Sequence, residues 1–445
     1  VGPNAGTPGD ASRSEEATIT QGVEISADGV TVDGLEVTND DVNGIVVTGA
    51  PSDVTVTNTV IRDIAGGTAG ASKGVGNGIN LQFNDAFEQT STGIEITDNL
   101  ITNVTTADAS GGSPDADAIG VQLLPRGNDV ENLRIVGNTI ENIEPGAAPG
   151  GRSEARAVSI GTQFTNTSGG ERGDLGQATN LTVTDNEVSN LTADFARAVA
   201  LFEDSKGAAS TSDNRVGPVN FTITGNNVSN VNSEADFFDL AIFIGEYGDF
   251  GNDHIVQDND FTGAAVENFG DSDALNTDGN TFSGDPKFDV HYTAANADLN
   301  SIINSNTFDR RVTIRNASGD LTGDTIFAGI QSAVDSTSSG DTVSVSDGTY
   351  NESVDIGTEN VTLVGPNAGT PGDASRGDEA IIEQGVKINA SEVTLDGVKV
   401  LIDGTNAVRI GPEVVPDDVT IQNNVVTNVG GGDFLRNNTP TGAGN

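Results

Sequence analysis

The chain has 445 residues and a formal net charge of −46, from 66 acidic and 20 basic residues, and it contains no cysteine and no methionine. So large an excess of negative charge argues against nucleic acid and against an anionic membrane surface as partners. The lack of cysteine excludes disulfides and thiolate metal sites. No apolar run reaches the roughly 18 residues that a membrane-spanning helix needs, so we expect no direct membrane insertion.

The acidic residues are spread evenly along the chain, whereas lysine is rare. Molar salt shortens the Debye length to about 3 Å and would screen the repulsion between these carboxylates. We therefore interpret the composition as that of a secreted protein of a halophilic archaeon. An acidic extracellular repeat protein from another organism is the alternative.

The chain opens on the phrase "VGPNAGTPGDASR", which returns at residues 364–376. The second copy follows a lead-in, residues 325–363, that the first copy lacks. We expect the chain to be one full period plus an overlap of a longer tandem array. The alternative is a subunit whose mature N-terminus is Val1 and which joins its neighbours head to tail.

Short phrases such as "VTVTNTVIRDI" at residue 54 and "LTVTDNEVSNL" at residue 181 recur along the first copy. Each alternates β-branched or aliphatic residues with polar ones, bends at an asparagine and alternates again, which indicates two strands joined by a bend. A further strand precedes each phrase, so we expect three strands per coil, with the Gly- and Ser-rich inserts forming loops on one side.

Aligning the phrases places asparagines in one column, which begins at Thr59. Asparagine tolerates the bend, and its amide can bond to its equivalent in the next coil. Turn preference alone would explain isolated cases. We predict an asparagine ladder at Asn99, Asn138, Asn186, Asn226, Asn259, Asn280 and Asn306. In the late coils we expect Phe261, Phe282 and Phe308 to stack inside.

The lead-in to the second copy reads "FAGIQSAVDSTSSGDTVSVSDGTYNESVDI". Its first part predicts a short amphipathic helix with Ile330, Ala333 and Val334 facing inward. A helix there would cover the open end of a solenoid and protect its strand edges.

With these repeats and this cap, the sequence resembles the pectin-lyase-like superfamily of right-handed parallel β-helices, including NosD-like repeat proteins. The resemblance implies an all-β fold, a β-solenoid in two tandem copies with a capping helix at the start of the second. We expect a first β-helix at residues 1–310, a junction at 311–324, and the cap and first coils of a truncated second β-helix at 325–445.

The resemblance also implies that some relatives are polysaccharide lyases, with Ca²⁺-binding carboxylates and an arginine base. "RRVTIR", from Arg310, lacks the proline of the lyase context. His254 and His291 stand far apart, so we expect both to be exposed polar residues. The pairs Asp236 with Asp239 and Asp271 with Asp273 are expected to be solvated surface. We predict that the chain is not an enzyme.

Aromatic residues are few and tryptophan is absent, which disfavours sugar-binding grooves built on stacking. The loop "GDSDALNTDGN" at residue 270 is the weak candidate for Ca²⁺, and we expect no other cofactor. Sequons for N-glycosylation are numerous. They begin at Asn103, Asn166, Asn180, Asn190, Asn220, Asn227, Asn316, Asn351, Asn360, Asn389 and Asn437.

From these observations we predict a structural protein of the cell surface that forms an extracellular β-helical array or filament, either S-layer-associated, an adhesin or a surface fibre. The expected partner is a second copy of the chain, head to tail or in covalent tandem, with a surface glycan as a further candidate. A polysaccharide lyase or hydrolase is one alternative, and a viral fibre or spike is another. A carboxylate cluster with a neighbouring basic residue on one β-helix face would favour the enzyme.

Overall fold

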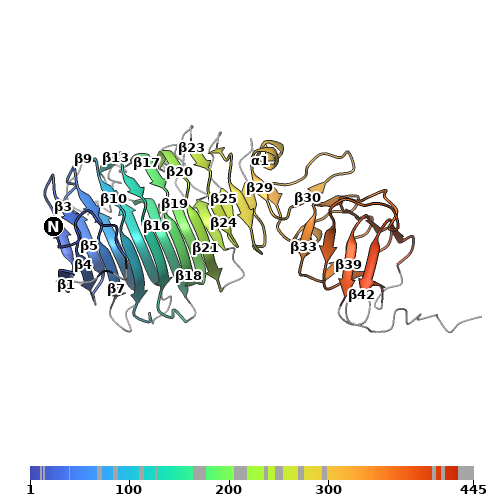
Figure 1. The fold of residues 1–445 in the computed structure, drawn as a ribbon, viewed down its shortest axis with the longest axis horizontal. Coiled ribbons are helices and arrows are strands. Elements are labelled where there is room, and N and C mark those ends of the chain that lie inside the picture. The colour runs from blue at the N-terminus through green and yellow to red at the C-terminus, as the bar shows by residue number, and fades with distance from the viewer. Residues whose placement is uncertain are drawn as a thin grey trace, which may run out of the picture. The chain divides into compact units, whose positions relative to one another are not determined.

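The computed structural model describes residues 1–10, 13, 16–39, 41–67, 73–83, 89–109, 115–125, 128–149, 151–163, 177–204, 218–234, 239–245, 254–268, 275–292, 298–402, 407–411 and 416–428. The chain divides into unit 1 (Val1–Pro286 and Val290–Thr307) and unit 2 (Lys287–Asp289 and Phe308–Asn445). Strands of each unit stack coil upon coil in parallel (Figure 1). The prediction of an all-β parallel β-helix is confirmed.

Unit 1 has three long parallel sheets, here named A, B and C. A coil contributes one strand to each sheet, except that two coils each contribute a further short strand, β9 or β13, to sheet C. Sheet A contains β1 (Thr18–Ile19), β4 (Glu36–Asn39), β7 (Val60–Gly66), β11 (Leu100–Thr106), β15 (Thr139–Glu144), β18 (Glu187–Ala193), β21 (Asn227–Ser233), β24 (Asp260–Thr262), β27 (Thr281–Ser283) and β29 (Thr307–Phe308). Sheet B contains β2 (Val23–Ile25), β5 (Asn43–Thr48), β8 (Lys73–Gln82), β12 (Asp115–Leu124), β16 (Arg152–Gln163), β19 (Phe195–Asp204), β22 (Leu240–Ile244), β25 (Ala265–Asn268) and β28 (Val290–Tyr292). Sheet C contains β3 (Thr31–Asp33), β6 (Thr55–Thr57), β9 (Thr90–Thr92), β10 (Glu95–Thr97), β13 (Asp129–Glu131), β14 (Arg134–Val136), β17 (Ala178–Thr184), β20 (Val219–Thr224), β23 (His254–Gln257) and β26 (Leu275–Asn276).

The core of unit 1 is a set of columns in which equivalent residues of successive coils stack. Because side chains alternate between the two faces of a strand, every second residue points into the solenoid. One column on sheet A is paired in register and fully buried: Ile61, Ile101, Ile140, Val188, Val228, Phe261 and Phe282. The rings of Phe261 and Phe282 lie 5.3 Å apart, whereas Phe308 is only half-buried.

Unit 2 contains the strands β30 (Val312–Arg315), β31 (Thr325–Ile326), β32 (Thr342–Val345), β33 (Gly348–Tyr350), β34 (Val354–Ile356), β35 (Thr362–Val364), β36 (Ala380–Ile382), β37 (Val386–Ile388), β38 (Thr394–Asp396), β39 (Lys399–Ile402), β40 (Val408–Ile410), β41 (Thr420–Gln422) and β42 (Val425–Asn428). Strand β30, inside the expected junction, pairs antiparallel with β32. The expected capping helix is α2 (Ile330–Asp335), which buries Ile330, Ala333 and Val334. Glu352 caps it, because its carboxylate accepts from the N–H groups of Ile330 and Gln331 at 2.6 and 2.9 Å.

A second helix, α1 (Leu299–Ser305), was not predicted from the sequence. Its N-cap Asp298 accepts from the backbone N–H groups of Asn300 and Ser301, and it buries Leu299 and Ile302. Among the described residues, no helix has the length and apolar character needed to cross a membrane.

The arginine that ends the repeated phrase makes the same contacts in both copies. In unit 1 the guanidinium of Arg13 donates to the carbonyl oxygens of Thr7 and Asn58, at 3.0 and 2.7 Å. In unit 2 the guanidinium of Arg376 donates to the corresponding carbonyls of Thr370 and Asn423, at 2.8 and 2.6 Å. The arginine that ends the phrase therefore ties this loop to a following coil.

Asp289 is a buried carboxylate in unit 2, with 1% of the residue exposed. Burial raises its pKa well above the ordinary value, nearby Asp309 raises it further and Arg310 opposes the shift. A raised pKa means that the folded state holds the proton more tightly than the unfolded chain. Stability from this group is therefore complete below the ordinary aspartate pKa of about 4 and falls as the pH rises through the raised value.

We therefore expect Asp289→Asn to raise the melting temperature at neutral pH, by the equivalent of roughly 1 kcal/mol or more, because an uncharged amide replaces a poorly solvated carboxylate. Below about pH 4 the gain should vanish. Melting followed by circular dichroism across this pH range measures both effects, with exposed Asp320→Asn as the control. A lower melting temperature for Asp289→Asn at neutral pH would contradict the prediction.

Candidate active site

The outer face of sheet B carries a cluster of arginines and carboxylates, here called the arginine cluster: Arg152, Glu154, Arg156 and Arg197. Strands β16 and β19 lie side by side, with Arg156 directly opposite Arg197 in the register. Alanines on either side of these arginines are fully buried in the core. The alternation of the strand therefore turns the arginines and Glu154 outward.

Glu154 is the centre of the arginine cluster. Its carboxylate pairs with Nε of Arg152 at 2.8 Å, with Nη2 of Arg156, and with Nη1 of Arg197 at 3.4 Å. The side chains of Glu154 and Arg197 are 8% and 10% exposed, whereas that of Arg152 is 48% exposed. The cluster thus has a buried floor and one arginine that reaches solvent.

Phenylalanine rings hold the guanidinium planes. Arg152 lies 4.1 Å from the ring centroid of Phe195, and Arg197 lies 4.2 Å from that of Phe243 and 5.5 Å from that of Phe195. A guanidinium over an aromatic face is attracted by the ring quadrupole and loses freedom to turn. These rings therefore fix the direction in which the arginines present their N–H groups.

The environment of Arg197 changes its acidity. Burial, followed by the positive charge of Arg152, lowers the pKa of Arg197 to about 10, while Glu267 and Asp117 oppose the shift. A guanidinium with a lowered pKa gives up its proton more readily than an ordinary one, and a perturbed group on an outer face is a candidate for proton transfer.

Polar side chains continue along the outer face of sheet B from the arginine cluster toward β28. Phe243, Glu267 and His291 are register partners on the adjacent strands β22, β25 and β28. Nδ1 of His291 lies 3.3 Å from Oε1 of Glu267. The side chain of His291 is 21% exposed, so the expectation of an exposed residue is met only in part. The pair of Glu267 and His291 therefore adds polar side chains next to the arginine cluster, along the solenoid axis.

His254 was expected to be exposed, and this prediction is wrong. It is fully buried in β23, with its ring stacked on Phe221 at a centroid distance of 4.0 Å. Asp239 is half-buried and accepts from the N–H of Ser233 at 2.6 Å, and burial raises its pKa. Asp236, Asp271 and Asp273 lie outside the described residues.

The column of asparagines forms a continuous row at the turn between sheets C and A, buried from Asn99 to Asn280 and half-buried at Asn306. Each Nδ2 donates to Oδ1 of the next member, at 2.9–3.0 Å for the five bonds from Asn138 to Asn306, and the bond from Asn99 to Asn138 is 3.0 Å. Each Oδ1 also accepts the backbone N–H of the preceding member, beginning with Thr59. These amides satisfy one another, so the ladder holds coils together and offers no reactive group.

The sequon asparagines differ in exposure. Those with exposed side chains are Asn103, Asn180, Asn190, Asn220, Asn227, Asn351 and Asn360. Asn316 and Asn389 are half-buried, and Asn166 and Asn437 lie outside the described residues. The part of the chain that the structure describes contains no group of three or more histidine or acidic side chains arranged to hold a metal ion. Residues 270–274 of the acidic loop at 270–280, the weak Ca²⁺ candidate, lie outside it.

The arginine cluster was missed from the sequence, although a signal was present. "EARAV" at residue 154 and "FARAV" at residue 195 repeat an arginine between two alanines in neighbouring coils. Small core residues on either side of a charged one indicate an outward arginine at the same height in both coils. Arg310, the candidate weighed from the sequence, donates to the carbonyl of Thr349 at 3.1 Å in unit 2.

Comparison with known proteins found solved structures only. No protein-family model matches the sequence, and no curated protein matches it. Among the solved structures is the PL6-family alginate lyase AlyGC, 11% identical, with a TM-score of 0.16, covering 94% of this chain and 73% of that chain. An arginine-to-alanine mutant of AlyGC is 12% identical, also with a TM-score of 0.16, covering 95% of this chain and 76% of that chain.

The prediction that this chain is not an enzyme is corrected here, since the two solved structures just named are alginate lyases. The feature that was to favour an enzyme, a carboxylate cluster with a neighbouring basic residue, differs from the arginine cluster, in which three arginines surround the single carboxylate of Glu154. Because both TM-scores are low, the function is inferred below from the chain's own residues.

Proposed function

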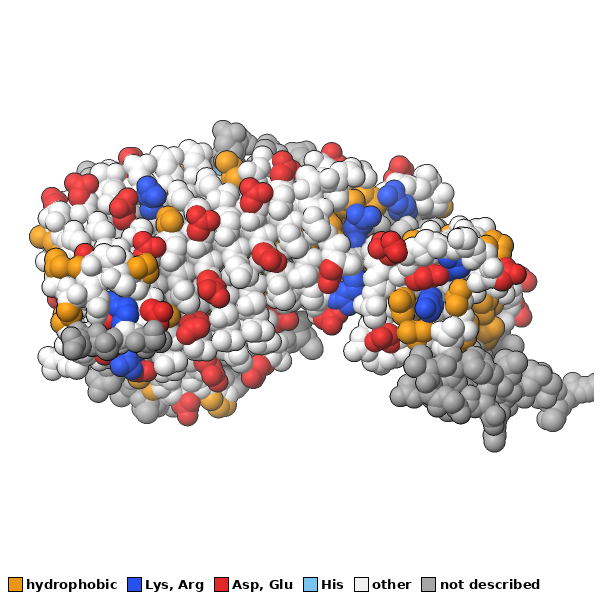
Figure 2. All heavy atoms as spheres, in the orientation of Figure 1, with side chains coloured by type: hydrophobic (Ala, Val, Ile, Leu, Met, Phe, Trp, Pro, Cys, Tyr) orange, Lys and Arg blue, Asp and Glu red, His pale blue; other side chains and the backbone are white. Residues whose placement is uncertain are grey.

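We propose that this chain is an enzyme that cleaves an acidic polysaccharide on the outer face of sheet B. The observation that carries the proposal is the convergence of three arginines on Glu154, with Arg197 shifted in pKa by its burial. Acidic side chains are otherwise scattered over the visible surface of unit 1 (Figure 2). An anionic chain would find in the arginine cluster a group of fixed donors that suits carboxylates.

The reaction class that suits this cluster is β-elimination at a uronic acid. Arg152 and Arg156 would pair with the sugar carboxylate and stabilise negative charge that develops beside it. Arg197, through the small neutral fraction that a pKa of about 10 leaves near neutral pH, would take the proton from the carbon next to the carboxylate. The electron pair left behind forms a carbon–carbon double bond, the glycosidic carbon–oxygen bond breaks, and the leaving oxygen takes a proton from water.

The test uses a panel of acidic polysaccharides, including alginate, pectate and hyaluronan. With the wild-type protein we expect ultraviolet absorbance from the new double bond on at least one of them. Arg197→Lys should lower kcat/KM by about 100-fold or more, because the ammonium lacks the planar fork and its pKa is tuned differently. Arg134→Lys is the matched control, since Arg134 is 53% exposed on sheet C, and should leave the rate unchanged.

No cleavage of any acidic polysaccharide by the wild-type protein would overturn the proposal. New reducing ends without absorbance would overturn elimination in favour of hydrolysis. Equal rates for Arg197→Lys and the wild-type protein would remove Arg197 as the base.

A filament role, an extracellular location and a halophilic source remain predictions that stand beside this proposal. Apolar residues of unit 2 favour end-to-end association: Ile410, Ile421 and Val426 are 49%, 41% and 41% exposed. Their counterparts in the first copy, Val47, Val56 and Ile61, are at most 1% exposed beneath the next coil. A further coil of the same kind, such as one from a second chain, would fit this end.

A further inference from the structure

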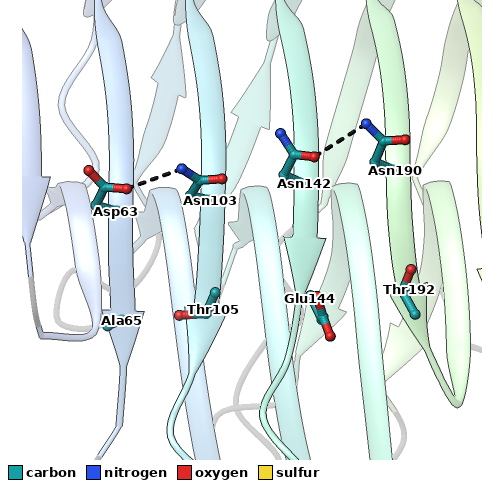
Figure 3. A pocket seen from close by; sticks show the side chains of 8 residues that line it. All are labelled: Asp63, Ala65, Asn103, Thr105, Asn142, Glu144, Asn190 and Thr192. Atoms are coloured by element: carbon teal, nitrogen blue, oxygen red, sulfur yellow. Dashed lines mark hydrogen bonds between the residues drawn. The ribbon is translucent and has the colours of Figure 1, made fainter.

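A second polar site lies on the outer face of sheet A, away from the arginine cluster. It is a groove of about 450 Å³ that crosses β7, β11, β15 and β18. Figure 3 shows its two rows of side chains, which run from strand to strand along the solenoid axis.

The groove follows from a bend that each of these strands makes at the same height. Asp63, Asn103, Asn142 and Asn190 have φ values of 56°, 56°, 57° and 56°, in the left-handed region that asparagine and aspartate tolerate. Strand pairing skips these residues, since Thr102 pairs with Arg62 and then Val104 with Ile64. A bend repeated in register in four neighbouring strands makes the outer face concave.

The first row consists of the bend residues themselves. Nδ2 of Asn103 donates to Oδ1 of Asp63 at 3.1 Å, and Nδ2 of Asn190 donates to Oδ1 of Asn142 at 3.2 Å. An asparagine amide has two N–H donors and two lone pairs, and these bonds use at most one donor of each amide. The row therefore presents further donors and acceptors to the groove at fixed intervals.

The second row lies two residues further along each strand and contains Ala65, Thr105, Glu144 and Thr192. It adds two hydroxyls and a carboxylate opposite the amides. Arg62 pairs with the carboxylate of Asp63 at 2.6 Å, so Glu144 is the carboxylate that disfavours an anionic ligand. The lining offers no aromatic or large apolar side chain to an apolar ligand. Amides, hydroxyls and carboxylates together suit the hydroxyl groups of a sugar, which both donate and accept.

We propose that this groove binds an uncharged, extended polysaccharide along the solenoid axis. Neighbouring strands lie about 4.8 Å apart, so equivalent donors and acceptors recur at roughly the length of one sugar unit in an extended chain. The ligand class differs from that of the arginine cluster because no basic side chain lines the groove and the one basic neighbour, Arg62, is paired with Asp63, which leaves the negative charge of Glu144. This inference does not depend on the proposed function.

Two of the groove asparagines, Asn103 and Asn190, begin sequons whose threonines, Thr105 and Thr192, also line the groove. A covalent glycan on either asparagine would fill the site. The protein for the test is therefore produced in a bacterial host that adds no N-glycans, and mass spectrometry verifies the unmodified mass.

The experiment measures binding of cellohexaose, mannohexaose and xylohexaose to the full chain by isothermal titration calorimetry. We expect at least one to bind, and Asn142→Gly with Asn190→Gly to weaken that binding about tenfold, because glycine keeps the left-handed bend and removes the amides. The matched control is Asn180→Gly with Asn220→Gly on sheet C, where φ is 55° and 53° and the side chains form a similar exposed row. That pair should leave the affinity unchanged.

The outcomes separate this site from the arginine cluster. The proposal is supported if Arg197→Lys leaves hexasaccharide binding unchanged and the groove variant weakens it. Lack of binding by all three hexasaccharides at millimolar concentration would overturn it, whatever the protein does to acidic polysaccharides. Equal loss of affinity in the sheet C pair would overturn the proposal, and so would a groove variant that melts well below the wild-type protein, because the fold would then explain the lost binding. The variant Thr105→Val with Thr192→Val repeats the test without touching the bend, since it keeps both strand residues β-branched.

Discussion

Asn186→Ala should lower the free energy of unfolding of unit 1 by about 3 kcal/mol. Asn186 is 2% exposed and sits in the middle of the asparagine ladder. Its Nδ2 donates to Oδ1 of Asn226 and to the carbonyl of Ile135, both at 2.9 Å. Its Oδ1 accepts from the backbone N–H and from Nδ2 of Asn138, both at 3.0 Å. Alanine would leave these partners buried without a bond.

The cost is large because the partners cannot turn to water. A buried donor or acceptor that loses its partner costs about 1–3 kcal/mol, and Asn186 serves several at once. Asn227→Ala is the matched control, since Asn227 is an exposed asparagine at the start of β21 in the next coil. The control should change stability by less than about 0.5 kcal/mol. Urea unfolding followed by circular dichroism compares the two, and equal effects would contradict a structural role for the ladder.

The coil could be predicted from the sequence because its determinants are local. Alternation within three to seven residues and an asparagine at each bend are enough to indicate strands, turns and a stacked column. The helix α2 was equally visible, since its apolar face lies within one short segment. Helix α1 was missed because its seven residues carry only two buried apolar side chains, Leu299 and Ile302.

The surface sites depend on relations between coils, which the sequence does not display directly. Arg156 lies opposite Arg197 because β16 and β19 pair in register despite the insert between them in the sequence. His254 is buried because its coil brings it against Phe221, 33 residues earlier. The groove on sheet A needs the same left-handed bend in four strands. From the sequence alone, the "N-x-T" pattern at two of these bends indicates only a sequon, because the φ values are not known.

Glu154→Gln should destabilise unit 1 by about 3–5 kcal/mol, more than the loss of any exposed ion pair. Glu154 is the carboxylate that contacts all three arginines of the arginine cluster, and the side chains of Arg156 and Arg197 are only 11% and 10% exposed. Removing one partner of a buried pair leaves an uncompensated charge in a poorly solvated place. Glutamine keeps the shape and supplies one oxygen, so the effect reports the lost charge.

Glu95→Gln is the matched control, because Glu95 lies 3.7 Å from Arg134 with side chains that are 42% and 53% exposed. An exposed pair of this kind contributes about 0–1 kcal/mol. Adding Arg197→Leu to Glu154→Gln should recover part of the lost stability, since it removes one uncompensated buried charge. Urea unfolding of the three variants decides the matter. If Glu154→Gln costs no more than Glu95→Gln, the arginines are solvated rather than held by Glu154, and the cluster cannot keep the lowered pKa of Arg197 that the proposed elimination needs.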